Sequence, residues 1–119
     1  YARAGHPPLI LIRKNKSQAY MTQGLGLGLV QNDQFENKIE EKIIQLRKKD
    51  YVFVYTDGLI EARDTEDEEY GEDRLNQLFQ SVTEQGVQDP LSLVKSRINI
   101  FTEGTPQTDD ITVMLLHIE

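Results

Sequence analysis

The fold of this sequence is decided by residues 51–58, Tyr51-Val52-Phe53-Val54-Tyr55-Thr56-Asp57-Gly58. The first five are β-branched or aromatic, which is typical of a strand that is apolar on both faces. Thr56-Asp57-Gly58 is a turn signal, so the chain changes direction directly after this strand. An acidic side chain therefore stands at the end of the clearest strand in the sequence.

A β-hairpin is predicted before this strand. Leu9–Ile12 is a continuous apolar run, and Gln18–Met21 can return beside it across a turn at Asn15-Lys16-Ser17. Residues 35–46 are compatible with two structures. Their apolar residues fit a helical period, whereas Ile43-Ile44 before a basic turn also fits a strand.

Two helices and a final strand are predicted after residue 58. Apolar residues at helical spacing indicate an amphipathic helix over residues 72–85. Asp89-Pro90 is an N-cap followed by a first-turn proline, and the helix that it starts continues to Gly104. Residues 111–118 indicate a terminal strand. This order predicts an antiparallel α+β domain rather than alternating βαβ units.

The length of 119 residues corresponds to one globular domain or less. Of these residues, 38% are hydrophobic and 28% are charged, which is too balanced for a disordered chain and too polar for a membrane protein. Cysteine is absent, which excludes disulfide scaffolds, cysteine zinc sites and thiol nucleophiles. We expect a cytoplasmic location, with which this composition is compatible.

The net charge of −7 is concentrated in residues 61–73, which hold eight acids and one base. The rest of the chain holds twelve charges of each sign. Nucleic-acid binding requires a basic face, and the one short basic run is Arg47-Lys48-Lys49, so we expect no nucleic-acid partner. The acidic run fits a solvated loop, or else a loop that lies near a metal ion or faces a partner.

Acidic residues stand at a second strand end. Asp109-Asp110 directly precedes the terminal strand, as Asp57 directly follows strand 51–56. If these strands are neighbours in one sheet, both acidic ends can lie at the same rim. Carboxylates without lysine or arginine beside them in sequence suit Mg²⁺ or Mn²⁺. The ordinary alternative is that Asp57-Gly58 is a simple turn and that the aspartate pair caps or solvates a loop.

Five motifs occur in a characteristic order along the chain. They are Ala4-Gly5-His6-Pro7-Pro8, Leu25-Gly26-Leu27, Tyr55-Thr56-Asp57-Gly58-Leu59-Ile60-Glu61-Ala62, Tyr70-Gly71-Glu72-Asp73-Arg74-Leu75 and Asp109-Asp110-Ile111-Thr112-Val113. In order and spacing they resemble the SpoIIE/RsbU-type branch of the PP2C-like (PPM) serine/threonine phosphatases. The resemblance implies an antiparallel β-sandwich flanked by helices, in an αββα arrangement, of which this chain is the C-terminal part.

The same resemblance implies a reaction and its ligands. Two Mn²⁺ or Mg²⁺ ions held by aspartates would activate a water that attacks phosphoserine or phosphothreonine in line. Asp57 matches the metal-binding Asp-Gly of the family, and Asp109 matches the metal aspartate of its last motif, with Asp110 as its neighbour. The expected partner is a phosphorylated regulatory protein, such as an anti-sigma-factor antagonist.

The sequence departs from the family pattern at its N-terminal side. Nothing in it matches the further metal-binding aspartate and glycine of the family's first half, so we expect this chain to be inactive by itself. Missing strands would leave sheet edges and an apolar face open, which favours a homodimer. We expect no membrane contact from this segment, because no apolar run in the sequence approaches the length of about 18 residues that spans a bilayer. The alternative function is a non-catalytic, degenerate phosphatase fold that binds a regulator or dimerises.

Overall fold

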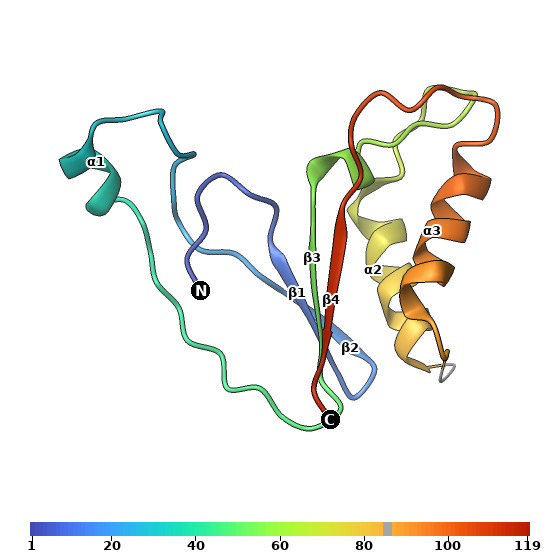
Figure 1. The fold of residues 1–119 in the computed structure, drawn as a ribbon, viewed down its shortest axis with the longest axis horizontal. Helices are drawn as coiled ribbons and strands as arrows, with labels where there is room; N and C mark the ends of the chain where they lie inside the picture. Colours follow the sequence, from blue (N-terminus) through green and yellow to red (C-terminus); the bar gives the residue numbers. More distant parts are fainter. Residues whose placement is uncertain (85–86) are drawn as a thin grey trace.

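The computed structural model describes residues 1–84 and 87–119, in which one antiparallel sheet is backed by two helices (Figure 1). The elements in chain order are β1 (Leu9–Arg13), β2 (Lys16–Tyr20), α1 (Asn32–Glu36), β3 (Tyr51–Tyr55), the 3-10 helix η1 (Asp57–Leu59), α2 (Gly71–Glu84), α3 (Pro90–Phe101) and β4 (Val113–His117). The strands lie in the order β2-β1-β3-β4, and every neighbouring pair is antiparallel. The predicted antiparallel α+β class is confirmed.

The predicted hairpin forms from β1 and β2, but its turn lies one residue earlier than expected. The turn residues are Lys14 and Asn15, at φ values of 51° and 60°, and Lys16 already belongs to β2. A two-residue turn with both φ values positive matches the right-handed twist of the flanking strands. The sequence marks turn-forming residue types but not these backbone angles, which is why the turn predicted at residues 15–17 was misplaced.

Neither structure predicted for residues 35–46 forms. Helix α1 ends at Glu36, and within residues 37–46 the only pairing is an isolated bridge between Ala2 and Glu41. Residue 42 is tied to the N-terminus, because the Tyr1 amine donates to the Lys42 carbonyl at 2.7 Å. Ile43 is 87% exposed, and Ile39 and Leu46 are only partly buried, so the apolar period of this segment does not match a buried face.

The core lies between the sheet and helices α2 and α3. The ring of Phe53 on β3 stacks on that of Phe79 on α2 with centroids 3.9 Å apart, and both side chains are fully buried. Helix α3 begins where predicted, because the Asp89 carboxylate accepts a hydrogen bond from the Ser92 amide at 3.1 Å. It ends at Phe101 rather than Gly104. The predicted last residue of the first helix, position 85, lies outside the described residues.

Helices α2 and α3 cover one face of the sheet only (Figure 1). On the other face of β4, Met114 and Leu116 are 60% and 50% exposed, although both are large and apolar. The described residues therefore supply one sheet and one helical layer of the expected sandwich. None of the helices in the described ranges is long and apolar enough to cross a membrane.

A partly buried ion pair joins β1 to the residue that precedes β3. Arg13 Nε donates to Asp50 Oδ1 at 2.8 Å, and the Arg47 amide donates to Asp50 Oδ2 at 2.7 Å. The Asp50 side chain is 1% exposed. Its hydrogen bonds with Arg13 hold the pKa of the Asp50 carboxyl below its ordinary value, and they raise the pKa of Arg13.

We expect Asp50→Asn to lower the free energy of unfolding by about 2 kcal/mol at pH 7, since it weakens hydrogen bonds between charged groups. Because the pKa of Asp50 is lower in the folded chain, the pair stabilises the fold above the ordinary aspartate pKa of about 3.9. This contribution is lost as the pH falls through the lowered pKa. Urea unfolding at pH 7 and pH 3 should show a smaller difference between variant and parent at pH 3.

The matched control is Glu103→Gln, which neutralises an exposed acid. It should leave the free energy of unfolding within about 0.5 kcal/mol of the parent value. Equal stability of Asp50→Asn and the parent chain at pH 7 would show that the pair contributes nothing to the fold.

Candidate functional site

The pairing of β3 with β4 places the predicted acidic residues at one rim of the sheet. Tyr55, the last residue of β3, lies opposite Val113, the first residue of β4. Beyond this pair, the Thr56 amide donates to the Thr112 carbonyl at 3.1 Å. Asp57 follows Thr56, and Asp109-Asp110 precedes β4 by two residues. We call these three aspartates the acidic rim.

The hydroxyl of Thr56 fastens the two sides of the acidic rim together. Its Oγ1 donates to the backbone carbonyl of Asp110 at 3.1 Å and accepts from the Thr112 amide at 2.9 Å. The backbone that carries Asp110 is thus held against the end of β3 by a side chain as well as by the sheet ladder. Thr56 is therefore a positioning residue for the acidic rim.

Gly58 brings the two acidic segments into direct contact. A Cβ atom placed on Gly58 would lie 2.7 Å from the Asp110 carbonyl oxygen and 3.3 Å from the Asp109 Cβ. The first distance is shorter than any ordinary contact, so a side chain at position 58 would push the Asp109-Asp110 backbone away. The close approach of η1 to Asp109 and Asp110 thus depends on glycine.

The carboxylates of the acidic rim are exposed and retain free oxygen lone pairs. Asp57 Oδ1 accepts from the Gly58 amide at 3.1 Å, and Asp109 Oδ1 accepts from the Asp110 amide at 2.7 Å. Within the described ranges, none of the three aspartates forms an ion pair with lysine or arginine. This donor set fits a hard divalent cation that prefers carboxylate oxygen.

The acidic rim nevertheless does not bring together enough ligands for a metal site within the described residues. Among the described residues, no group of three or more histidine, cysteine, aspartate or glutamate side chains is arranged to hold a metal ion. The fold brings the segments of Asp57 and Asp109-Asp110 together, and further ligands would have to come from elsewhere.

A small polar cavity of about 210 Å³ lies beside the acidic rim. Of the three aspartates, only Asp109 lines it, and the loop of residues 105–109 and the C-terminal half of α3 supply much of its wall. Thr105 fixes this loop, because its hydroxyl donates to the Arg63 carbonyl at 2.8 Å. The cavity is a place where a polar group could lie next to Asp109.

The acidic run of residues 61–73 is exposed over most of its length but is not a loose loop. Arg63 pairs with Asp67 at 3.2 Å, and Arg74 pairs with Glu68 at 2.8 Å. Asp64 Oδ1 also accepts from the amides of Glu66 and Glu68. The expectation of solvated carboxylates holds for these side chains, and their arginine partners order the loop. The alternative that the acidic run lies near a metal ion has no support from a cluster of metal-binding side chains among the described residues.

Two features of this region were missed by the sequence reasoning. Thr56 was interpreted only as part of a turn, although a hydroxyl next to a predicted acidic ligand could have drawn attention. The contact of Gly58 with Asp109 and Asp110 links positions that are far apart in sequence, and only the register of β3 with β4 reveals it.

The sequence model of the family described as Stage II sporulation protein E (SpoIIE) matches residues 1–119. No curated protein sequence matches the chain. Solved structures share its fold. The SiaA-PP2C domain of Pseudomonas aeruginosa superimposes with a TM-score of 0.82 at 15% identity, over 99% of this chain and 46% of that one.

Two further structures show the same relationship. The PP2C phosphatase domain of SpoIIE from Bacillus subtilis, with a regulatory-domain fragment, gives a TM-score of 0.76 at 19% identity, covering 99% of this chain and 33% of that one. The RsbU and RsbW domains of Rv1364c from Mycobacterium tuberculosis give a TM-score of 0.65 at 24% identity. This match covers 97% of this chain and 30% of that one. The chain thus spans between 30% and 46% of the length of these structures.

Proposed function

This chain belongs to the SpoIIE family, and on that premise we propose that it forms part of a metal-dependent phosphatase acting on phosphoserine or phosphothreonine. The acidic rim is the observation that carries this proposal. It joins the ends of β3 and β4, its carboxylates are exposed, and Gly58 allows its two segments to touch. The PP2C fold of the solved structures supports the same function.

Asp57 and Asp109 are the residues that would hold Mn²⁺ or Mg²⁺, with Asp110 as a neighbouring oxygen donor. When bound, such ions activate water and neutralise charge on a phosphoryl group. The residues of this chain also fix the positions of these carboxylates. Thr56 holds the Asp110 carbonyl, and Gly58 leaves room for the Asp109-Asp110 backbone. Rigid placement of this kind maintains the spacing of the carboxylates that catalysis requires.

We propose that the remaining metal ligands come from residues outside this 119-residue segment, which would be the C-terminal portion of a phosphatase domain. Two observations support this. The acidic rim is an incomplete metal site within the described ranges, and the chain covers only 33% and 46% of two solved phosphatase structures. The segment alone would then lack turnover.

The proposed substrate is a phosphorylated regulatory protein of a partner-switching pathway, such as an anti-sigma-factor antagonist, in the cytoplasm. The motif resemblance to RsbU-type phosphatases supports it. The exposed Met114 and Leu116 on β4 support a second possibility, a non-catalytic module that dimerises through this sheet face. Both functions would use the open face of the sheet, either for the rest of the domain or for a second copy.

One experiment separates these functions. We expect no Mn²⁺-dependent release of phosphate from a phosphoserine peptide by the purified 119-residue chain, and clear release by a chain extended to the full length of the phosphatase domain. Light scattering on the same samples measures self-association. Turnover by the short chain would contradict the incomplete site. An extended chain that is inactive but dimeric through Met114 and Leu116 would favour the non-catalytic module.

A further inference from the structure

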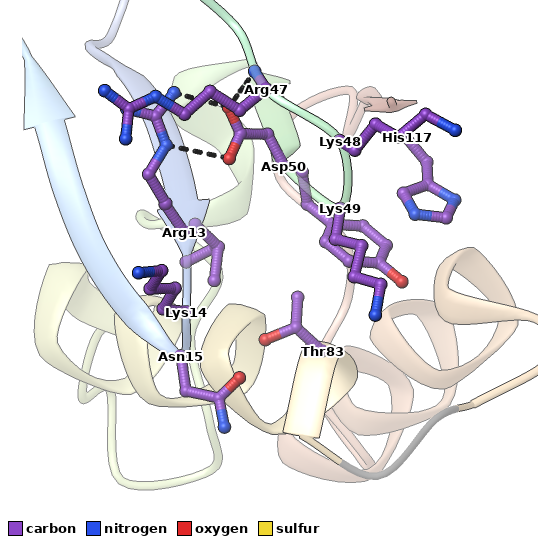
Figure 2. A pocket seen from close by; sticks show the side chains of 11 residues that line it. Arg13, Lys14, Asn15, Arg47, Lys48, Lys49, Asp50, Thr83 and His117 are labelled. Atoms are coloured by element: carbon purple, nitrogen blue, oxygen red, sulfur yellow. Dashed lines mark hydrogen bonds and ion pairs between the residues drawn. The ribbon is translucent and has the colours of Figure 1, made fainter. Parts of the chain in front are cut away.

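A basic pocket lies at the end of the sheet opposite the acidic rim. Its cavity has a volume of about 480 Å³, and its walls come from the β1–β2 turn, the segment before β3, the end of β4 and Thr83 of α2 (Figure 2). The charged residues that line it are Arg13, Lys14, Arg47, Lys48, Lys49 and Asp50. Strand β3 separates the two sites, because Tyr51 at its first position borders this pocket, whereas Asp57 lies two residues beyond its last position, Tyr55.

The pocket concentrates positive charge on a chain whose net charge is −7. Five of the six charged residues are basic, and the single acid, Asp50, is already bonded to Arg13. None of the other four basic residues forms an ion pair within the part of the chain that the structure describes. In sequence, Arg47-Lys48-Lys49 was a short basic run, and folding adds Arg13 and Lys14 to it.

Two of these lysines have backbone conformations that are unfavourable for residues with a side chain. Lys14 has a φ of 51° and Lys49 a φ of 69°, in the left-handed region that glycine and asparagine tolerate best. The amide of Lys49 is fixed there by donating to the Ile118 carbonyl at 2.7 Å. The turn before β2 and the turn before β3 set these angles, so turn geometry places both lysines beside the pocket. Both strained lysines line the same pocket, and in Figure 2 they extend on either side of Thr83.

The shape of the pocket favours a small ligand. Its volume lies in the range of about 300–1,000 Å³ that is usual for small-molecule sites. The rings of Tyr51 and His117 also line the pocket and stack with centroids 4.2 Å apart. A long nucleic acid would also meet the acidic remainder of the surface, which repels a phosphate backbone. A compact, multiply charged anion could bind in the pocket without contacting the acidic remainder of the surface.

We propose that the basic pocket binds a small anion carrying two or more phosphate groups, at a site separate from the acidic rim. The flexible side chains of Lys14 and Lys49 can approach such an anion from either side of Thr83 (Figure 2), and Arg13, held by Asp50, keeps one side of the pocket in place. The chemistry required is that of a diphosphate or triphosphate. It can be carried by a free small molecule or by a lipid headgroup, and the structure favours the free form because the pocket is concave.

The test is calorimetric titration of the purified chain with sodium tripolyphosphate, pyrophosphate and orthophosphate at 50 mM and 200 mM NaCl. We expect tripolyphosphate and pyrophosphate to bind, orthophosphate to bind at least about tenfold more weakly, and the higher salt to weaken binding. Lys14→Gly and Lys49→Gly should each weaken tripolyphosphate binding about tenfold. Both should leave Tm unchanged or raise it, because glycine relieves the left-handed strain.

Matched controls are Lys16→Gln and Lys38→Gln, which remove the same charge outside the pocket and should change the affinity less than about twofold. Asp57→Asn should bind tripolyphosphate like the parent chain, which keeps this result independent of the proposed phosphatase function. Unchanged affinity in both glycine variants would overturn the proposal. So would equal binding of orthophosphate, equally tight binding of a polyglutamate peptide, or binding only to vesicles that contain phosphatidylinositol bisphosphate.

Discussion

Replacing Asp57 or Asp109 with asparagine is expected to lower the turnover of a phosphoserine peptide by the complete phosphatase domain by at least about 100-fold. Changes in residues that only support metal ligands already cost about 10–100-fold, so loss of a direct ligand should cost more. Each replacement also removes a negative charge from a rim on which like charges repel one another. The metal-free fold should therefore be as stable as the parent, or slightly more stable.

The measurement is turnover with Mn²⁺, paired with melting curves recorded with and without the ion. Mn²⁺ should raise the Tm of the parent domain and raise it less in either variant, since a ligand that binds only the folded state stabilises it. The control neutralises Glu66, Asp67 and Glu68 together in the acidic loop. Its exposed ion pairs contribute little, so turnover should change less than about threefold. Normal turnover in Asp57→Asn or Asp109→Asn, or its loss in the loop variant, would show that the metal ligands are misassigned.

Gly58→Ala is expected to reduce turnover about 100-fold, although it removes no functional group. The new methyl group would lie 2.7 Å from the Asp110 carbonyl oxygen, so the backbone on one side must move. Displacement by about 1 Å far from the chemistry can cost two orders of magnitude, and here the displaced segment carries Asp109 itself. Overpacking should also lower the free energy of unfolding by about 1–3 kcal/mol.

Gly71→Ala is the matched control for Gly58→Ala. Gly71 has a φ of +76°, and no atom lies within 4 Å of a Cβ placed there. Its replacement should therefore cost about 1 kcal/mol of stability through backbone strain, with turnover unchanged. Thermal unfolding and peptide turnover of both variants measure whether the loss of turnover is specific to position 58. If the two variants lost turnover equally, the contact between η1 and Asp109-Asp110 would have no special role.

The strongest local signals in the sequence predicted the elements that carry the acidic rim. The aromatic and β-branched run at residues 51–55 and the Asp89 N-cap need only near neighbours to act, and both appear where expected. Because the antiparallel class was also correct, Asp57 and Asp109 could be expected at one rim. Their roles as metal ligands remain predictions.

Features that depend on distant partners could not be predicted in the same way. Asp50 was unremarked in the sequence, because its partner Arg13 lies 37 residues away. The apolar residues within 35–46 fit a helical period in the sequence, but Ile43 is 87% exposed and the period does not match a buried face in the part of the chain that the structure describes. Likewise, lysines at positions 14 and 49 give no sign of their left-handed backbone, which arises from the geometry of two turns.

The pairing of β3 with β4 also dictates when the acidic rim can exist during folding. Strand β4 reaches β3 only after α2 and α3, which lie between them in the chain, have been made. Closing so long a loop is entropically costly and slow compared with forming the β1–β2 hairpin. During synthesis Asp57 leaves the ribosome well before Asp109, so a nascent chain carries only Asp57 of the acidic rim until residues 109 and 110 emerge. Any cation that requires both aspartates binds only after β4 has docked, and it then favours the finished topology over every earlier intermediate.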